Sequence, residues 1–448
     1  MRGNPDHPQT PAEPAGTGLS PQPESVLAAS EYPRYRRWVH VLTILLVLAT
    51  FVLIAIGGHV TSHEAGMAVP EAFFTGKYWS LIAPLEVWWY DFGRRLEHSH
   101  RLKGYLVGSI TIAVMIALLW TQGRRKWLKI LGIGLLVFVI AQGILGILRV
   151  ALHHNSWVTG LSFAAIHGVT GQMFFCLTVL AAAATGKFWM SRAAEKSPQT
   201  QSQNAPRAVR LKRAIRVLPL LLILGLLGQL ALGSAVRHSK SALAIPDWPM
   251  HYGQLVPPMN QADIDAAVAA VPAEERHDKF ALPKADADGN LQPGGYADWQ
   301  VHLHFSHRLG AYALFAFGII FTAWLWRRYP GQGAVLWPAT LFAAILCVQV
   351  LLGVMTVVTG EHPTLATSHQ SVGAILMATA TWLAIRLHLV PVPSARPAHV
   401  PVAAGDATTE VFHNTWPNVL ETAPQSTATS ADRSAPSRPQ PEPQTVNA

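Results

Sequence analysis

The chain has 448 residues, of which 50% are hydrophobic and 13% are charged. A soluble domain carries about 25% charged residues, so this composition excludes an ordinary soluble enzyme and a largely disordered protein. The net charge of +9 is better explained by Lys and Arg at the cytoplasmic ends of membrane helices than by a nucleic-acid partner. Cys176 and Cys347 each lie inside an apolar block, so neither a disulfide framework nor a cysteine-based zinc site is expected.

Both ends of the chain are rich in small and polar residues and lack periodicity. We therefore expect disordered tails over residues 1–30 and 390–448. Between them lie eight apolar blocks, each long enough to cross a bilayer, which takes about 20 residues. The blocks cover residues 39–60, 101–120, 130–150, 161–185, 217–236, 303–326, 334–357 and 365–388.

Basic residues are concentrated at alternate ends of these blocks. Arg34, Arg36 and Arg37 precede the first block, and the segment 186–216 between the fourth and fifth blocks is rich in Lys and Arg. Since basic residues favour the cytoplasmic side, the pattern predicts a multi-pass protein of the inner (cytoplasmic) membrane with both termini in the cytoplasm.

The apolar blocks form an internal repeat. Ser99-His100-Arg101-Leu102 recurs as Ser306-His307-Arg308-Leu309, at the start of the second and sixth blocks. Other matching positions are Gln142 and Gly146 with Gln349 and Gly353, and His167 with His369. The repeat predicts an all-α, polytopic membrane fold of eight transmembrane helices arranged as two tandem four-helix bundles. The bundles would cover residues 39–185 and 217–388, joined by a cytoplasmic linker over 186–216. The second would carry a long extracytoplasmic loop, 237–300, with a helix-prone part around 261–279.

Four histidines occupy equivalent positions near the start of the even-numbered spans: His100, His167, His307 and His369. One histidine on each of two helices of a bundle can ligate a haem iron from both faces. A single histidine at a helix end is usually satisfied by water, but four in register favour a ligand role. The sequence thus suggests two pairs, His100 with His167 and His307 with His369. The remaining histidines, mostly assigned to loops, are expected to be solvated.

Glu97 distinguishes the first half from the second, where His304 takes its place. Three residues before His100, it shares a helix face with that histidine. Beside a porphyrin it could accept a proton or stabilise a developing cation. Pairing with Arg94, Arg101 or another base at the surface is an equally good explanation. Arg101 and Arg308 could likewise pair with haem propionates, although capping or lipid contact would explain them nearly as well.

The residues Glu97-x-x-His100-Arg101, His167, His307-Arg308 and His369 resemble the haem A synthase family. The segments Gly66–Pro70 and Ala244–Pro249 add support, and the resemblance covers about residues 39–388. It implies an oxidoreductase that converts the C8 methyl group of haem O to a formyl group through two hydroxylations, yielding haem A for a terminal oxidase.

The same resemblance implies roles for the candidate residues. His100 and His167 would hold the substrate haem O with Glu97 assisting catalysis, and His307 and His369 would hold a haem b that passes electrons. A haem O-producing farnesyltransferase and a terminal oxidase would be partners. One departure stands out: the first extracytoplasmic loop lacks the cysteine pair found in some bacterial members, so a thiol step in that loop is not expected.

Two other functions are compatible with the histidine pattern. A di-haem, cytochrome b-like electron carrier would use all four histidines but would leave the one-sided Glu97 unexplained. A haem transporter or assembly scaffold would need weak, exchangeable ligation and would catalyse no reaction.

Overall fold

The structure, a computed structural model, describes residues 35–69, 89–123, 125–152, 157–194, 206–270, 283–285, 291–293 and 296–391. The chain divides into two units, 1–394 and 395–448, and the described residues all belong to the first. The tails expected at 1–30 and 390–448 therefore lie outside the described residues, apart from Val390 and Pro391.

The described part of the chain contains eight helices long and apolar enough to cross a membrane. This confirms the predicted all-α, multi-pass fold. The helices that contain these spans are α2 (Arg37–Ser62), α4 (Phe92–Thr121), α5 (Lys126–Ala151), α6 (Trp157–Thr185), α8 (Pro206–His238), α10 (Asp298–Arg328), α11 (Gly333–Val358) and α12 (Pro363–Leu389).

Several helices extend beyond the apolar blocks of the sequence. Helix α4 begins at Phe92 rather than near residue 101, and α10 begins at Asp298 rather than near residue 303. The extra turns are polar, so hydropathy alone does not reveal them. At α4 the side chain of Asp91 accepts a hydrogen bond from the backbone N–H of Arg94 at 3.0 Å, which is a typical helix N-cap. The predicted linker also contains helix α7 (Lys187–Ala194) and the first turns of α8.

The connecting segments include short elements of their own. A 3₁₀ turn, η1 (Ala65–Met67), follows α2, and helix α9 (Gln261–Ala270) covers the first part of the stretch predicted to be helix-prone, whose remainder, 271–279, lies outside the described residues. The strands β1 (Pro283–Ala285) and β2 (Leu291–Pro293) pair antiparallel in the same loop.

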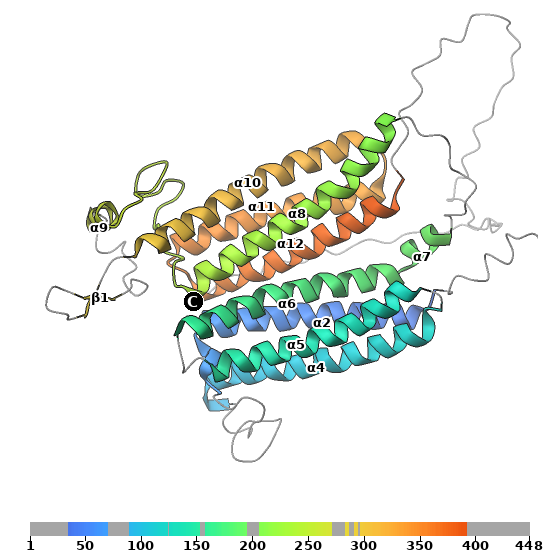
Figure 1. Cartoon of the computed structure of the whole chain (residues 1–448), viewed down its shortest axis with the longest axis horizontal. Helices are drawn as coiled ribbons and strands as arrows, with labels where there is room; N and C mark the ends of the chain where they lie inside the picture. The colour runs from blue at the N-terminus through green and yellow to red at the C-terminus, as the bar shows by residue number, and fades with distance from the viewer. Residues whose placement is uncertain are drawn as a thin grey trace, which may run out of the picture. The chain divides into compact units, whose positions relative to one another are not determined.

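The membrane helices pack in two sets of four. Helices α2, α4, α5 and α6 contact one another around one set, and α8, α10, α11 and α12 around the other (Figure 1). The sets meet where α12 packs on α2 and α6, and where α6 packs on α8. This packing is consistent with two tandem four-helix bundles.

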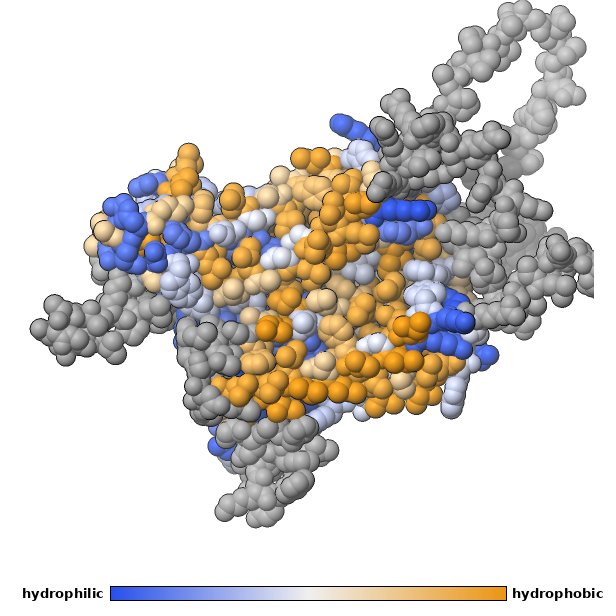
Figure 2. All heavy atoms as spheres, in the orientation of Figure 1, coloured by the Kyte–Doolittle hydropathy of each residue, from blue (hydrophilic) through white to orange (hydrophobic). Residues whose placement is uncertain are grey.

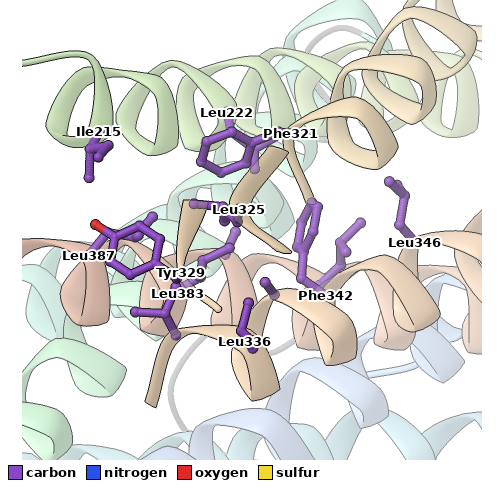
Figure 3. Packing of buried hydrophobic residues seen from close by; sticks show 14 of the residues in the cluster. Ile215, Leu222, Phe321, Leu325, Tyr329, Leu336, Phe342, Leu346, Leu383 and Leu387 are labelled. Carbon is purple, nitrogen blue, oxygen red and sulfur yellow. The ribbon is translucent and has the colours of Figure 1, made fainter. Parts of the chain in front are cut away.

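Each set has its own hydrophobic core. Phe321, Leu325, Tyr329 and Phe342 pack together in the second set (Figure 3), and Leu46 and Leu118 belong to the core of the first. Figure 2 shows hydrophobic residues across the middle of the helices and hydrophilic ones gathered toward both ends. That surface suits a bilayer, where lipid contacts the apolar belt and water contacts the ends.

Candidate functional site

The four candidate histidines lie in the second to fourth turns of the even-numbered spans, on α4, α6, α10 and α12. His100 is within electrostatic reach of His167, and His307 is within electrostatic reach of His369. The fold therefore brings together, in each half, the two histidines that the sequence suggests as a haem-binding pair.

The first histidine of each half packs against a glycine on the preceding helix. A Cβ atom added at Gly57 of α2 would lie 2.9 Å from Cε1 of His100, and one at Gly233 of α8 would lie 2.8 Å from Cε1 of His307. Carbon atoms in contact stay about 3.5–4.0 Å apart. The imidazole rings thus occupy space that only glycine leaves open.

The second histidine of each half has the same kind of neighbour. A Cβ atom at Gly353 of α11 would lie 3.0 Å from Cε1 of His369, whereas one at Gly146 of α5 would lie 3.6 Å from Cε1 of His167. A side chain at residue 353 would therefore crowd the His369 ring, while the Gly146 position leaves ordinary contact distance to His167. Gly146 and Gly353, which occupy equivalent positions in the sequence repeat, thus pack against the rings of His167 and His369.

The backbone one turn before each glycine faces the same histidine. The residues that contribute this carbonyl group are Leu53, Gln142, Gln229 and Gln349. At His369 the distance from Nδ1 to the Gln349 carbonyl oxygen is 3.1 Å. Nδ1 of His100 and of His167 is buried and completes no hydrogen bond of regular geometry with the described residues. A carbonyl at Nδ1 favours the tautomer in which Nε2 carries the ligating lone pair.

Two glutamine side chains add contacts in the second half. Gln229 Nε2 lies 3.0 Å from Nδ1 of His307 and donates to the His307 backbone carbonyl at 2.7 Å. Gln349 Nε2 lies 3.4 Å from Nε2 of His369. In the first half Leu53 stands where Gln229 does, and Gln142 donates to Thr170 at 2.6 Å instead.

Glu97 is buried, with 4% of its surface exposed. One carboxylate oxygen accepts from the Val69 backbone N–H at 2.7 Å, and the other accepts from Arg101 Nη2 at 2.8 Å. Arg101 Nη2 also donates to the Val69 carbonyl at 2.6 Å. Glu97 and Arg101 together hold the segment that follows η1. Pairing of Glu97 with a base is thus correct, but its expected surface position is wrong, because the loop covers it.

The second half repeats this arrangement with His304 in place of Glu97. The Ile245 backbone N–H and Arg308 Nε face the two ring nitrogens of His304 at 3.3 and 3.1 Å, and Arg308 Nη2 donates to the Ile245 carbonyl at 2.7 Å. A neutral imidazole has one acceptor nitrogen, so His304 can accept only one of these bonds. Glu97 accepts both and adds a negative charge.

Arg308 also organises the loop after α8. Its Nη1 donates to the carbonyl groups of Asp247 and Met250 at 2.8 and 3.3 Å. The Asp247 carboxylate accepts from the backbone N–H groups of Tyr252 and Gly253 at 2.7 and 2.8 Å. Burial and the nearby Asp247 carboxylate raise the pKa of Tyr252, so its hydroxyl stays protonated and donates to the Ala244 carbonyl.

Three histidines expected to be solvated are instead buried: His98, His251 and His304, with 2%, 4% and 3% exposed. His98 and His304 lie in the polar first turns of α4 and α10. Burial lowers the pKa of His251, and the Arg308 charge lowers it further. The expectation of solvation is wrong for these three residues because the loops fold over the helix ends.

The structure also places two arginines near the histidine pairs that the sequence did not single out. Arg149, in the last turn of α5, is within electrostatic reach of both His100 and His167. Arg237, in the last turn of α8, is within reach of His369 and donates to the Gly58 carbonyl of α2 at 3.3 Å. In the sequence, only the position of each arginine at the end of an apolar helix indicates that it could lie near such a site.

The COX15-CtaA family model, described as cytochrome oxidase assembly protein, matches residues 94–381. The match covers more than half of the chain. The chain belongs to the COX15-CtaA family. All seven predicted site residues fall within the match: Glu97, His100, Arg101, His167, His307, Arg308 and His369.

Several bacterial relatives in this family are named heme A synthase. The chain is 26% identical over 389 residues to the one from Methylobacterium sp. (strain 4-46), covering 81% of this chain and 94% of the relative. It is 27% identical over 392 residues to the one from Methylorubrum populi, covering 80% and 88%. For the one from Symbiobacterium thermophilum, identity is 29% over 204 residues, covering 45% and 60%. The similarity thus extends over both helix sets.

Proposed function

We propose that this membrane protein is an oxidoreductase that converts haem O to haem A, oxidising the C8 methyl group to a formyl group for assembly of a cytochrome oxidase. Family membership and the names of the relatives support the activity. The observation that carries the proposal is the duplicated histidine site with a carboxylate beside only one of its copies. One copy is thereby suited to chemistry and the other to holding a cofactor.

The side chains fit a haem in each half. The histidine rings come from two helices of one set, and at His369 the Gln349 carbonyl at Nδ1 favours a lone pair on Nε2 for iron. His100 and His167 would hold the substrate haem O, and His307 and His369 a resident haem b. When bound, haem b supplies one-electron redox chemistry.

Glu97 would move a proton at the first site. It lies one helical turn before His100 on the same face, and the loop segment that contains Val69 covers it. An ionised carboxylate has about four acceptor positions, so two remain after the bonds from Val69 and Arg101. One of these can accept a proton from a hydroxyl group on the substrate. The role expected for Arg101 and Arg308 at haem propionates stays a prediction.

The proposed setting is the inner membrane with both termini in the cytoplasm. The basic residues at one end of the helices support this orientation, including Arg37, Lys126 and Arg328. A haem O-producing farnesyltransferase would supply the substrate, and a terminal oxidase would receive the product.

Pigment analysis tests this function. The chain is produced in cells that contain haem O but lack their own haem A synthase, and the extracted haems are separated. We expect haem A together with its hydroxylated precursor. Haem b alone would contradict the proposal and would favour a di-haem electron carrier. Unchanged haem O, bound and readily exchanged, would favour a transport or assembly scaffold.

The glycine beside His307 gives a second prediction. In Gly233→Ala the new Cβ would lie 2.8 Å from the ring, so His307 must move and the second haem should bind roughly tenfold more weakly or worse. Gly228→Ala is the matched control on the same helix, because nothing lies within 4 Å of its Cβ position. Haem content per purified protein is measured. Equal haem content in the two variants would show that the packing of Gly233 against the His307 ring does not position His307 for binding haem.

A further inference from the structure

Arg149 lies on the face of α5 that lines the first histidine site. It follows Gly146 by three residues, so the two share a helix face, and the Gly146 Cβ position is 3.6 Å from the His167 ring. At its other side the guanidinium rests on η1, where a Cβ added at Gly66 would lie 3.1 Å from Arg149 Cζ. Arg149 thus lies between the part of α5 that packs against the His167 ring and the loop that Glu97 holds through Val69.

This guanidinium has no ion-pair or hydrogen-bond partner among the residues that the structure describes. Glu97 acts on it only electrostatically, beyond ion-pair distance. Leaving a partly buried charge unpaired is unfavourable. A ligand carboxylate beside Arg149 would remove this cost.

The other arginines near the sites are already engaged. Arg101 and Arg308 hold loop carbonyl groups, and Arg237 donates to α2. At the second-half position equivalent to Arg149 stands Thr356, whose hydroxyl donates to the Leu352 carbonyl at 2.8 Å. Within the described part of the chain, an unpaired guanidinium on this helix face is therefore a property of the first site.

From these contacts we infer that Arg149 binds a propionate carboxylate of the tetrapyrrole held between His100 and His167. The inference rests on the proposed function, because it takes the first site to be a haem site. Guanidinium and carboxylate can form two parallel hydrogen bonds, so one propionate would set the rotation of the macrocycle about the line joining the histidines. That rotation decides which ring substituent faces Glu97. Arg149 is accordingly a positioning residue.

The test compares ferric haem b with its dimethyl ester, whose propionates carry no charge. Each is titrated into the detergent-solubilised protein that retains its resident pigment, and binding is followed by absorbance. We expect the wild type to bind the free acid about tenfold more tightly than the ester, as a charge-assisted hydrogen bond implies. In Arg149→Gln this preference should fall to near unity. In Arg149→Lys, which keeps the charge and guards against a folding defect, it should be intermediate.

Two controls separate the outcomes. Arg386 lies in the last turn of α12, about 25 Å along the helix from His369, and its guanidinium stacks on Phe188 of α7. Arg386→Gln should therefore keep the full preference for the free acid. His100→Ala should abolish the titration. If it does not, the first site is not a haem site and the proposed function fails. If His100→Ala abolishes binding but Arg149→Gln keeps the tenfold preference, only the inference about Arg149 is overturned.

Discussion

Haem A formation is expected to fall roughly 10²- to 10⁴-fold when Glu97 is replaced by glutamine, the range typical of removing a general acid or base. The amide oxygen can still accept hydrogen bonds from Val69 or Arg101, so the loop should stay in place and both haems should remain bound. Glu97→Ala should stop haem A formation as well. It would also leave the buried donors that face Glu97 unsatisfied, at a cost of about 1–3 kcal/mol for each neutral group.

Glu64→Gln provides the matched control for that change. Glu64 also follows α2, but its carboxylate is exposed and pairs with Lys240 at 3.0 Å. Exposed pairs contribute little to stability, so turnover should stay at the wild-type level. Turnover is measured as haem A formed per protein, alongside total bound haem. Full turnover in Glu97→Gln would mean that Glu97 anchors the loop and takes no part in the reaction.

Loss of the low-spin haem b spectrum is the second large effect expected, in His307→Ala and in His369→Ala. His307 and His369 would together hold the haem iron in its low-spin state, so removing either one should eliminate the signal. The protein should still insert in the membrane, because the helices keep their apolar surfaces. Reduced-minus-oxidised absorbance of purified protein gives the readout.

His388→Ala is the control on the same helix. His388 lies near the other end of α12, and its Nδ1 contacts the Ala384 carbonyl at 2.8 Å. The same chemical change there should leave the spectrum intact. An unchanged spectrum in His369→Ala would show that the second pair does not ligate haem.

The repeat made much of this site predictable from the sequence. Equivalent histidines must lie at equivalent places if two halves fold alike, so His100 and His307 could be matched before any coordinates. The same comparison exposed the difference between Glu97 and His304. The eight spans followed from hydropathy, because the bilayer demands long apolar helices.

Other features depend on contacts between distant parts of the chain. Nothing near Arg149 in the sequence indicates that it rests on Gly66, and nothing near Arg101 indicates that it holds Val69. The polar first turns of α4 and α10 were missed because apolar periodicity is the signal for a span, and those turns lie beyond it. The same limitation of hydropathy explains why the sequence predicts solvent exposure for His98 and His304, which lie in these turns.

In the proposed function, the first histidine pair receives haem O while the second holds haem b. This assignment of the two haems is tested most directly by extracting the haems from purified wild-type and His100→Ala protein made in cells that supply haem O. We predict haem b in both, with haem O, its hydroxylated form and haem A in the wild type alone. Haem O-derived pigment in His100→Ala at the wild-type amount would contradict the account.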